Sequence, residues 1–134
     1  MEKYIEDMRS RLNKFFLKDN NVLFAYLYGS MNEMSDLDIA VYLAITDILT
    51  FDLHYQLEQC VQKEIDLLIL NTAPIELAYS AHKGLLIFER DKRARIEFEV
   101  NIRKKYWDFV PVLRIHFDHS RKKLKELYQK WHQE

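Results

Sequence analysis

Cysteine, glycine and proline are scarce in this chain of 134 residues, which contains one cysteine, two glycines and two prolines. The single cysteine, Cys60, excludes an internal disulfide and a thiolate metal site, and we expect it to be a small buried residue of a helix. Few glycines and prolines indicate long regular elements joined by short loops.

Long apolar runs are also missing. No stretch approaches the roughly 18 consecutive apolar residues that a membrane-spanning helix needs, and the N-terminal segment is charged and amphipathic. We therefore expect a cytoplasmic protein with no signal peptide and no membrane partner.

Neither sign of charge dominates, because 20 basic residues face 21 acidic ones and the net charge is −1. The positive field typical of nucleic-acid-binding proteins is absent, so direct nucleic-acid binding is not expected. Apolar residues make up 49% of the chain, which is enough for one modest core. We expect a single domain over residues 1–134, with a core at about 1–90 and a helical C-terminal region at about 91–134.

Apolar residues recur with helical spacing in some segments and form short uninterrupted runs in others. Helices are expected at residues 3–18, from Thr46 or Asp47 to about 63, at 74–84, and from 91 onward with a bend near Pro111. Strands are expected at residues 22–28, 37–43, 64–70 and 85–88. Strands that alternate with helices indicate an α/β (α+β) fold, in which helices pack on a small mixed sheet.

The most informative stretch joins the first two expected strands. Gly29 and Ser30 follow the first strand, and Asp36 and Asp38 open the second. Alternation along a strand puts both carboxylates on one side, about 6.5 Å apart at their Cα atoms. Paired carboxylates suit a divalent cation, a glycine lets the backbone approach a phosphate, and the serine adds a hydroxyl. The stretch predicts a site that holds a nucleoside triphosphate through magnesium.

A third carboxylate, Asp66, lies in the otherwise apolar strand at residues 64–70. A charge there costs several kcal/mol unless it is paired or bound to a metal. If this strand neighbours the second one, Asp36, Asp38 and Asp66 converge and can hold two Mg²⁺ ions about 3.5–4 Å apart. Asp66 would then also help to take the proton of an attacking hydroxyl. The competing interpretation is that these aspartates serve only in turns and caps.

At these residues the chain resembles the nucleotidyltransferase superfamily that includes DNA polymerase beta. It is most similar to the minimal nucleotidyltransferases, small prokaryotic proteins paired with HEPN-domain partners. The resemblance covers most of the chain. The matching segments are Leu27-Tyr28-Gly29-Ser30, Ser35-Asp36-Leu37-Asp38-Ile39-Ala40-Val41, Glu64-Ile65-Asp66-Leu67, Ala73-Pro74 with the stretch from Gly84 to Asp91, and Tyr106-Trp107-Asp108-Phe109-Val110-Pro111.

The resemblance implies a magnesium-dependent nucleotidyltransferase with ATP as its substrate. Many paired minimal nucleotidyltransferases are antitoxins that transfer AMP from ATP to a tyrosine of a HEPN ribonuclease toxin, and we expect the same activity and partner here. The residues that the resemblance assigns are Asp36, Asp38 and Asp66 for catalysis and metal binding, and Gly29, Ser30 and Ser35 for nucleotide binding.

The loop between Ser30 and Asp36 departs from the family pattern. Five residues separate Ser30 from Asp36, where the family usually has about ten that form a helical turn with N–H donors for the triphosphate. Two interpretations therefore stay open: an active enzyme, and a catalytically inactive module that neutralises a HEPN partner by contact. A weaker alternative is transfer to a small acceptor such as an aminoglycoside, for which the chain offers no second domain.

The C-terminal region is rich in aromatic residues, which are Trp107, Phe109, Phe117, Tyr128 and Trp131. We expect some of them to pack on the sheet and the rest to contact a partner or a second copy of the chain.

Arg114 and His119 are separated by four residues, as in the ribonuclease motif of HEPN proteins. The region is too short for a four-helix HEPN domain, so we interpret these residues as part of a solvated helix face. A metal site built on His116 and His119 is the remaining alternative.

Overall fold

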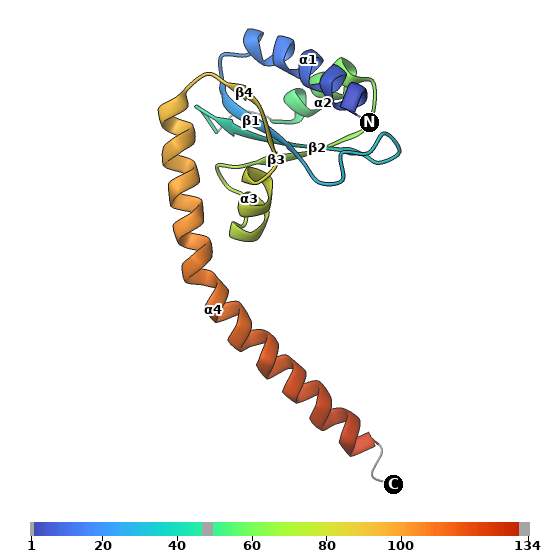
Figure 1. The fold of residues 1–134 in the computed structure, drawn as a ribbon, viewed down its shortest axis with the longest axis vertical. Helices are drawn as coiled ribbons and strands as arrows, with labels where there is room; N and C mark the ends of the chain where they lie inside the picture. Colours follow the sequence, from blue (N-terminus) through green and yellow to red (C-terminus); the bar gives the residue numbers. More distant parts are fainter. Residues whose placement is uncertain (1, 47–49, 132–134) are drawn as a thin grey trace.

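Four helices and four strands make up the part of the chain that the computed structural model describes, residues 2–46 and 50–131 without the side chains of residues 113, 116, 117 and 131. Their order is α1 (Glu2–Lys18), β1 (Val22–Tyr28), β2 (Leu37–Leu43), α2 (Thr50–Val61), β3 (Ile65–Ile69), α3 (Ile75–His82), β4 (Leu85–Glu89) and α4 (Lys92–Trp131) (Figure 1). The α/β (α+β) class predicted from the alternation of strands and helices is confirmed.

The four strands form one mixed sheet in the order β3-β2-β1-β4. β1 runs antiparallel to both β2 and β4, whereas β2 and β3 run parallel. The connection from β2 to β3 passes through α2, as a parallel pair requires. The strand that carries Asp66 therefore neighbours the strand that carries Asp38.

One face of the sheet is covered by α1 and α2. Its core combines Met8, Leu12 and Phe16 of α1 and Leu53, Leu57 and Val61 of α2 with every second residue of β2, namely Leu37, Ile39, Val41 and Leu43. Leu12 and Phe16 are fully buried, and each such side chain contributes about 1.5–3 kcal/mol of hydrophobic stabilisation.

The opposite face is covered by α3 and the first part of α4. Phe24 stacks on Tyr42 with ring centroids 4.9 Å apart, and Phe98 of α4 packs against both rings. Ala78 and Ala81 of α3 are buried in the same cluster. Small side chains let α3 lie close to β1, which positions the end of α3 beside the end of that strand.

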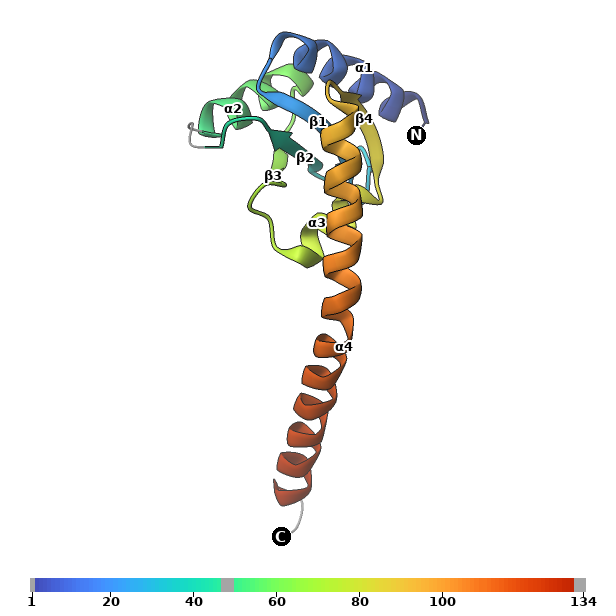
Figure 2. The ribbon, with the colours of Figure 1, turned by 90° about the vertical axis from the view of Figure 1, so that its left-hand side faces the viewer.

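The distal half of α4 extends away from the sheet and its covering helices, and both views show no other element beside it (Figure 2). The helix continues through Pro111, which has no N–H to donate, and Figure 1 shows that its direction changes along its length. None of the described helices combines the length and the apolarity needed to span a membrane.

Two local predictions concern the start of α2 and the burial of Cys60. α2 is described from Thr50 onward, and residues 47–49 lie outside the described part of the chain, so the cap predicted at Thr46 or Asp47 stays a prediction. Cys60 is half-buried rather than buried, and its Sγ donates to the carbonyl oxygen of Arg11 at 3.4 Å, between α2 and α1.

Candidate active site

The candidate carboxylates lie where β1 ends and where β2 and β3 begin. Asp38 is opposite Tyr28 of β1 and beside Asp66 of β3 in the strand register. Residues paired across neighbouring strands share one face of a sheet. Asp36 is two residues before Asp38, immediately ahead of β2, so alternation directs it to the same side.

This face is the one covered by α3 and α4, and the site lies at its edge. Asp38 is half-buried, while Asp36 and Asp66 are exposed. A ligand can therefore approach Asp36 and Asp66 from solvent, while the half-buried Asp38 is held against the sheet.

The three carboxylates interact electrostatically. Burial raises the pKa of the Asp38 carboxyl, and a hydrogen bond with the Asp66 side chain, the charge of Asp66 and the charge of Asp36 raise it further. Burial also raises the pKa of the Tyr28 hydroxyl, as do the charges of Asp38 and Asp66. Negative charge is thus concentrated at one point, which attracts a cation.

The donor set fits magnesium in its chemistry, because Mg²⁺ prefers carboxylate oxygens. As the side chains stand, no three His, Cys, Asp or Glu residues of the described chain are grouped tightly enough to hold a metal ion. Asp38 and Asp66 are paired across β2 and β3, and Asp66 helps to raise the pKa of Asp38. The side chain of Asp36 is exposed to solvent.

Both glycines of the chain lie against this site. Gly29 has a φ of +76°, and a Cβ there would overlap the carboxylate of Asp38. A Cβ at Gly84, between α3 and β4, would overlap the carbonyl oxygen of Leu27 and lie 2.9 Å from the Cβ of Tyr28. The backbone approaches so closely at both positions that only glycine fits.

A Gly84→Ala variant is expected to lower the free energy of unfolding by about 2 kcal/mol, because the new methyl group meets a rigid backbone oxygen. Urea unfolding followed by circular dichroism measures the change. Ser80→Ala, at an exposed position of α3, is the matched control and should leave the free energy of unfolding within a few tenths of a kcal/mol of the wild type. Equal midpoints for the two variants would contradict the close approach at residue 84.

The loop between Gly29 and Asp36 is held by Lys63. Its Nζ donates to the carbonyl oxygens of Glu33 at 3.0 Å and Ser35 at 2.5 Å, and to the hydroxyl of Tyr4 at 2.8 Å. Ser35 N–H donates in turn to the carbonyl of Asn32 at 3.1 Å. One lysine thus fixes the segment that leads into Asp36.

The predicted nucleotide-binding residues are brought to the same edge. Gly29 and Ser30 form the turn that follows β1, and both are exposed. Ser35 is half-buried and immediately precedes Asp36.

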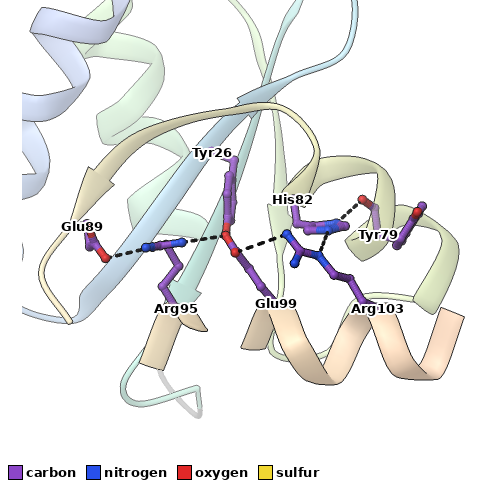
Figure 3. Close-up of polar contacts among 7 residues, drawn as sticks. All are labelled: Tyr26, Tyr79, His82, Glu89, Arg95, Glu99 and Arg103. Atoms are coloured by element: carbon purple, nitrogen blue, oxygen red, sulfur yellow. Dashed lines mark hydrogen bonds and ion pairs between the residues drawn. The ribbon is translucent and has the colours of Figure 1, made fainter. Parts of the chain in front are cut away.

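A second polar cluster joins α4 to β1 and α3 on the same face (Figure 3). The Tyr26 hydroxyl donates to Glu99 at 2.6 Å, and Arg95 bridges Glu99 at 3.1 Å and Glu89 at 2.8 Å. Burial opposes the ionisation of Glu99, but the hydrogen bonds from Tyr26 and Arg95 prevail and lower its pKa. The cluster anchors the first half of α4 and contributes no group to the carboxylate site.

His82 completes this cluster as a neutral imidazole. Its Nδ1 lies 2.5 Å from the carbonyl oxygen of Tyr79, and its Nε2 accepts a hydrogen bond from Arg103 Nε at 3.2 Å. Burial lowers the pKa of His82, and the charges of Arg103 and Lys83 lower it further, against the opposing effects of Tyr79 and Glu99.

The free energy of unfolding should therefore fall as the pH falls below about 6.5, because the unfolded chain binds a proton that folded His82 resists. This loss of stability continues until the pH reaches the pKa of His82 in the folded chain. It is absent well above a pH of about 6.5, which is the ordinary pKa of a histidine side chain. Urea unfolding at several pH values should show a smaller acid dependence for His82→Asn than for the wild type. His119→Asn, an exposed histidine of α4, is the control. Equal acid dependence in wild type and His82→Asn would contradict the assignment.

The exposure of Arg114 and His119 agrees with the predicted solvated helix face, and the alternative metal site on His116 and His119 is not tested. Arg114 and His119 are exposed on the distal half of α4, and the side chain of His116 lies outside the described residues.

Three residues of the site receive no role of their own from the sequence. Tyr28 looks like part of an apolar run, Gly84 looks only like the end of a helix, and nothing in the sequence distinguishes Lys63 from other lysines. The close approach at Gly84 and the loop contacts of Lys63 join segments that are distant in the sequence, so no local pattern marks them.

The profile of the family described as polymerase beta, nucleotidyltransferase, matches residues 10–93, a range that contains both glycines and all three carboxylates. A search of curated proteins found no match.

Solved structures share the fold. A crystal structure of the toxin–antitoxin MntA-HepT has a chain that matches with a TM-score of 0.70 at 21% identity, over 87% of this chain and 98% of that one. A tri-AMPylated Shewanella oneidensis HEPN toxin in complex with MNT antitoxin matches with a TM-score of 0.69 at 21% identity, over 85% and 98% of the two chains. A crystal structure of a toxin–antitoxin with AMP-PNP has a chain that matches with a TM-score of 0.70 at 22% identity, over 84% of this chain and 98% of that one.

Proposed function

This chain belongs to the polymerase beta nucleotidyltransferase family, and on that premise we propose that it transfers AMP from ATP to a tyrosine of a HEPN ribonuclease toxin, acting as the antitoxin. The observation that carries the proposal is the strand register that sets Asp38 beside Asp66, with Asp36 two residues before Asp38, next to the turn at Gly29. A nucleotidyl transfer needs such a concentration of carboxylates next to backbone that a triphosphate can approach.

The structural relatives support the partner and the reaction. One of them is a tri-AMPylated HEPN toxin bound to an MNT antitoxin, and another contains AMP-PNP. Because their sequences are only 21% and 22% identical to this chain, the activity of this chain rests on its own residues and needs its own test.

In the proposed reaction, Asp36, Asp38 and Asp66 would hold Mg²⁺. Magnesium bound there supplies the positive charge that neutralises the triphosphate and the leaving pyrophosphate. The exposed backbone of Gly29 and the hydroxyl of Ser30 contact the β- and γ-phosphates.

The chemical step is an in-line displacement at the α-phosphorus. The acceptor tyrosine oxygen forms the new bond to phosphorus, and the bond from the α-phosphorus to the pyrophosphate oxygen breaks. Asp66, which is exposed at the site, takes the tyrosine proton. The protein contributes mainly positioning, since the Gly29 turn and the Lys63-held loop fix both sides of the site.

The experiment incubates the chain with α-³²P-labelled ATP, Mg²⁺ and a HEPN toxin, either the one encoded beside this chain or the Shewanella oneidensis toxin. Label should appear on the toxin, and it should disappear with the double variant Asp36→Asn, Asp38→Asn. Label that persists with the double variant, or never appears, would contradict the proposal.

One observation favours a second candidate, a binding module without catalysis. Residues 31–36 contain no helical turn behind Ser30, so the backbone donors of a helix N-terminus are missing there. Toxin inhibition that survives the same double change, with no label on the toxin, would assign this function instead.

A further inference from the structure

The distal half of α4 has no other described element beside it (Figure 1 and Figure 2), and its sequence carries an apolar seam. From residue 110 the sequence repeats apolar residues at alternating steps of three and four. The seam positions are Val110, Leu113, Phe117, Ser120, Leu124, Leu127 and Trp131, with Ser120 as the one polar member. Leu124 and Leu127 expose 67% and 49% of their surface. Three heptads with this spacing are typical of a helix that pairs with another helix along its length.

The seam continues a contact that already exists. Tyr106, one step before Val110, stacks on Tyr79 of α3 with ring centroids 3.6 Å apart and planes 3° from parallel. The first half of α4 is also fixed to β1 through Glu99 and Tyr26. The seam is therefore presented on a helix that is anchored at one end.

The charges beside the seam restrict its partner. The seam residues occupy positions a and d of a heptad repeat, and positions e and g flank them. Every charged residue at e and g is basic: Arg114, Arg121, Lys123 and Lys130. The acidic residues Asp118 and Glu126 occupy positions away from the seam. A second copy would align basic flanks with basic flanks in either orientation, and such contacts are repulsive.

We propose that the distal half of α4 binds a helix of another protein, one whose apolar seam is flanked by aspartate and glutamate. Apolar burial supplies the affinity, and pairing of acidic with basic flanks selects the partner over a second copy. A nucleic acid would match the basic flanks but leave Leu124 and Leu127 uncovered. Binding of this helix is independent of nucleotidyl transfer, because it uses no residue of the carboxylate site.

Two synthetic helical peptides of about 28 residues test the proposal on the full chain. Both carry leucine at the seam positions; one has glutamate and the other lysine at every flanking position. Fluorescence anisotropy should show binding of the glutamate peptide at least about tenfold tighter than that of the lysine peptide. Reversing two flanks, with Arg121→Glu and Lys123→Glu, should reduce or invert this preference.

A matched pair of variants separates the seam from the rest of the helix. Leu124→Asp should abolish binding of the glutamate peptide, whereas Gln129→Asp, on the opposite side of α4, should leave it within about twofold. Both positions are exposed, so folding is retained. Equal affinity for the two peptides, or none for either, would overturn the proposal. So would self-association in sedimentation that Leu124→Asp removes, or tighter binding of a single-stranded RNA than of the glutamate peptide.

Discussion

An Asp38→Asn variant is expected to transfer AMP at least about 10³-fold more slowly than the wild-type chain, while remaining as stable or becoming more stable. Asp38 lies between Tyr28 and Asp66 in the strand register and is the half-buried member of the carboxylate group. An amide in its place keeps the shape but loses the charge that attracts the cation. It also relieves repulsion from Asp36 and Asp66, which is why the folded state should not suffer.

Single-turnover transfer of label from α-³²P-labelled ATP measures the rate, and urea unfolding measures the stability. Glu33→Gln is the matched control, because Glu33 is an exposed carboxylate of the same loop whose backbone oxygen, not its side chain, contacts Lys63. A rate for Asp38→Asn within about tenfold of the control would contradict a role for Asp38 in the reaction.

A Gly29→Ala variant is the second change with a large expected effect, a loss of about 10² in transfer rate together with about 1–2 kcal/mol of stability. The φ of +76° is unfavourable for any residue with a Cβ. In addition, the new methyl group would overlap the Asp38 carboxylate and push it out of position. The backbone penalty reduces stability, and the displaced carboxylate reduces activity.

The same two assays measure both effects. Met34→Ala, in the same loop and 92% exposed, is the control for introducing alanine there and should be neutral. A Gly29→Ala chain that loses stability but transfers AMP at the control rate would show that the reaction tolerates displacement of Asp38, and would contradict the positioning role of Gly29.

The sequence is enough to predict the elements and the sheet edge where the site lies. The strand predicted at residues 37–43 is β2 as observed, and Ile65–Ile69 lies within the strand predicted at 64–70. These elements are readable because their apolar runs are short, uninterrupted and bounded by polar residues. The sheet order places β3 beside β2, which is the condition for the predicted convergence of Asp36, Asp38 and Asp66. In the described structure, however, the three carboxylates are not grouped tightly enough to hold a metal ion, so the site itself stays a prediction.

What the sequence does not reveal are contacts between distant segments. The backbone at Gly84 packs closely against Leu27 and Tyr28, which come much earlier in the chain. Nothing in the sequence near residue 84 indicates this contact. Lys63 is one of many lysines until the fold brings it to the carbonyls of Glu33 and Ser35. The roles of Ser30 and Ser35 in nucleotide binding remain predictions, because they concern a ligand rather than the fold.

The most direct test of the central claim is a titration with Mn²⁺ in the presence of AMP-PNP, followed by electron paramagnetic resonance of the free ion. The wild-type chain and Glu64→Gln, which alters an exposed carboxylate two residues before Asp66, should bind Mn²⁺ alike. Asp66→Asn should bind at least about tenfold more weakly. Equal binding by all three proteins, or no binding by the wild type, would contradict a cation site built from Asp36, Asp38 and Asp66.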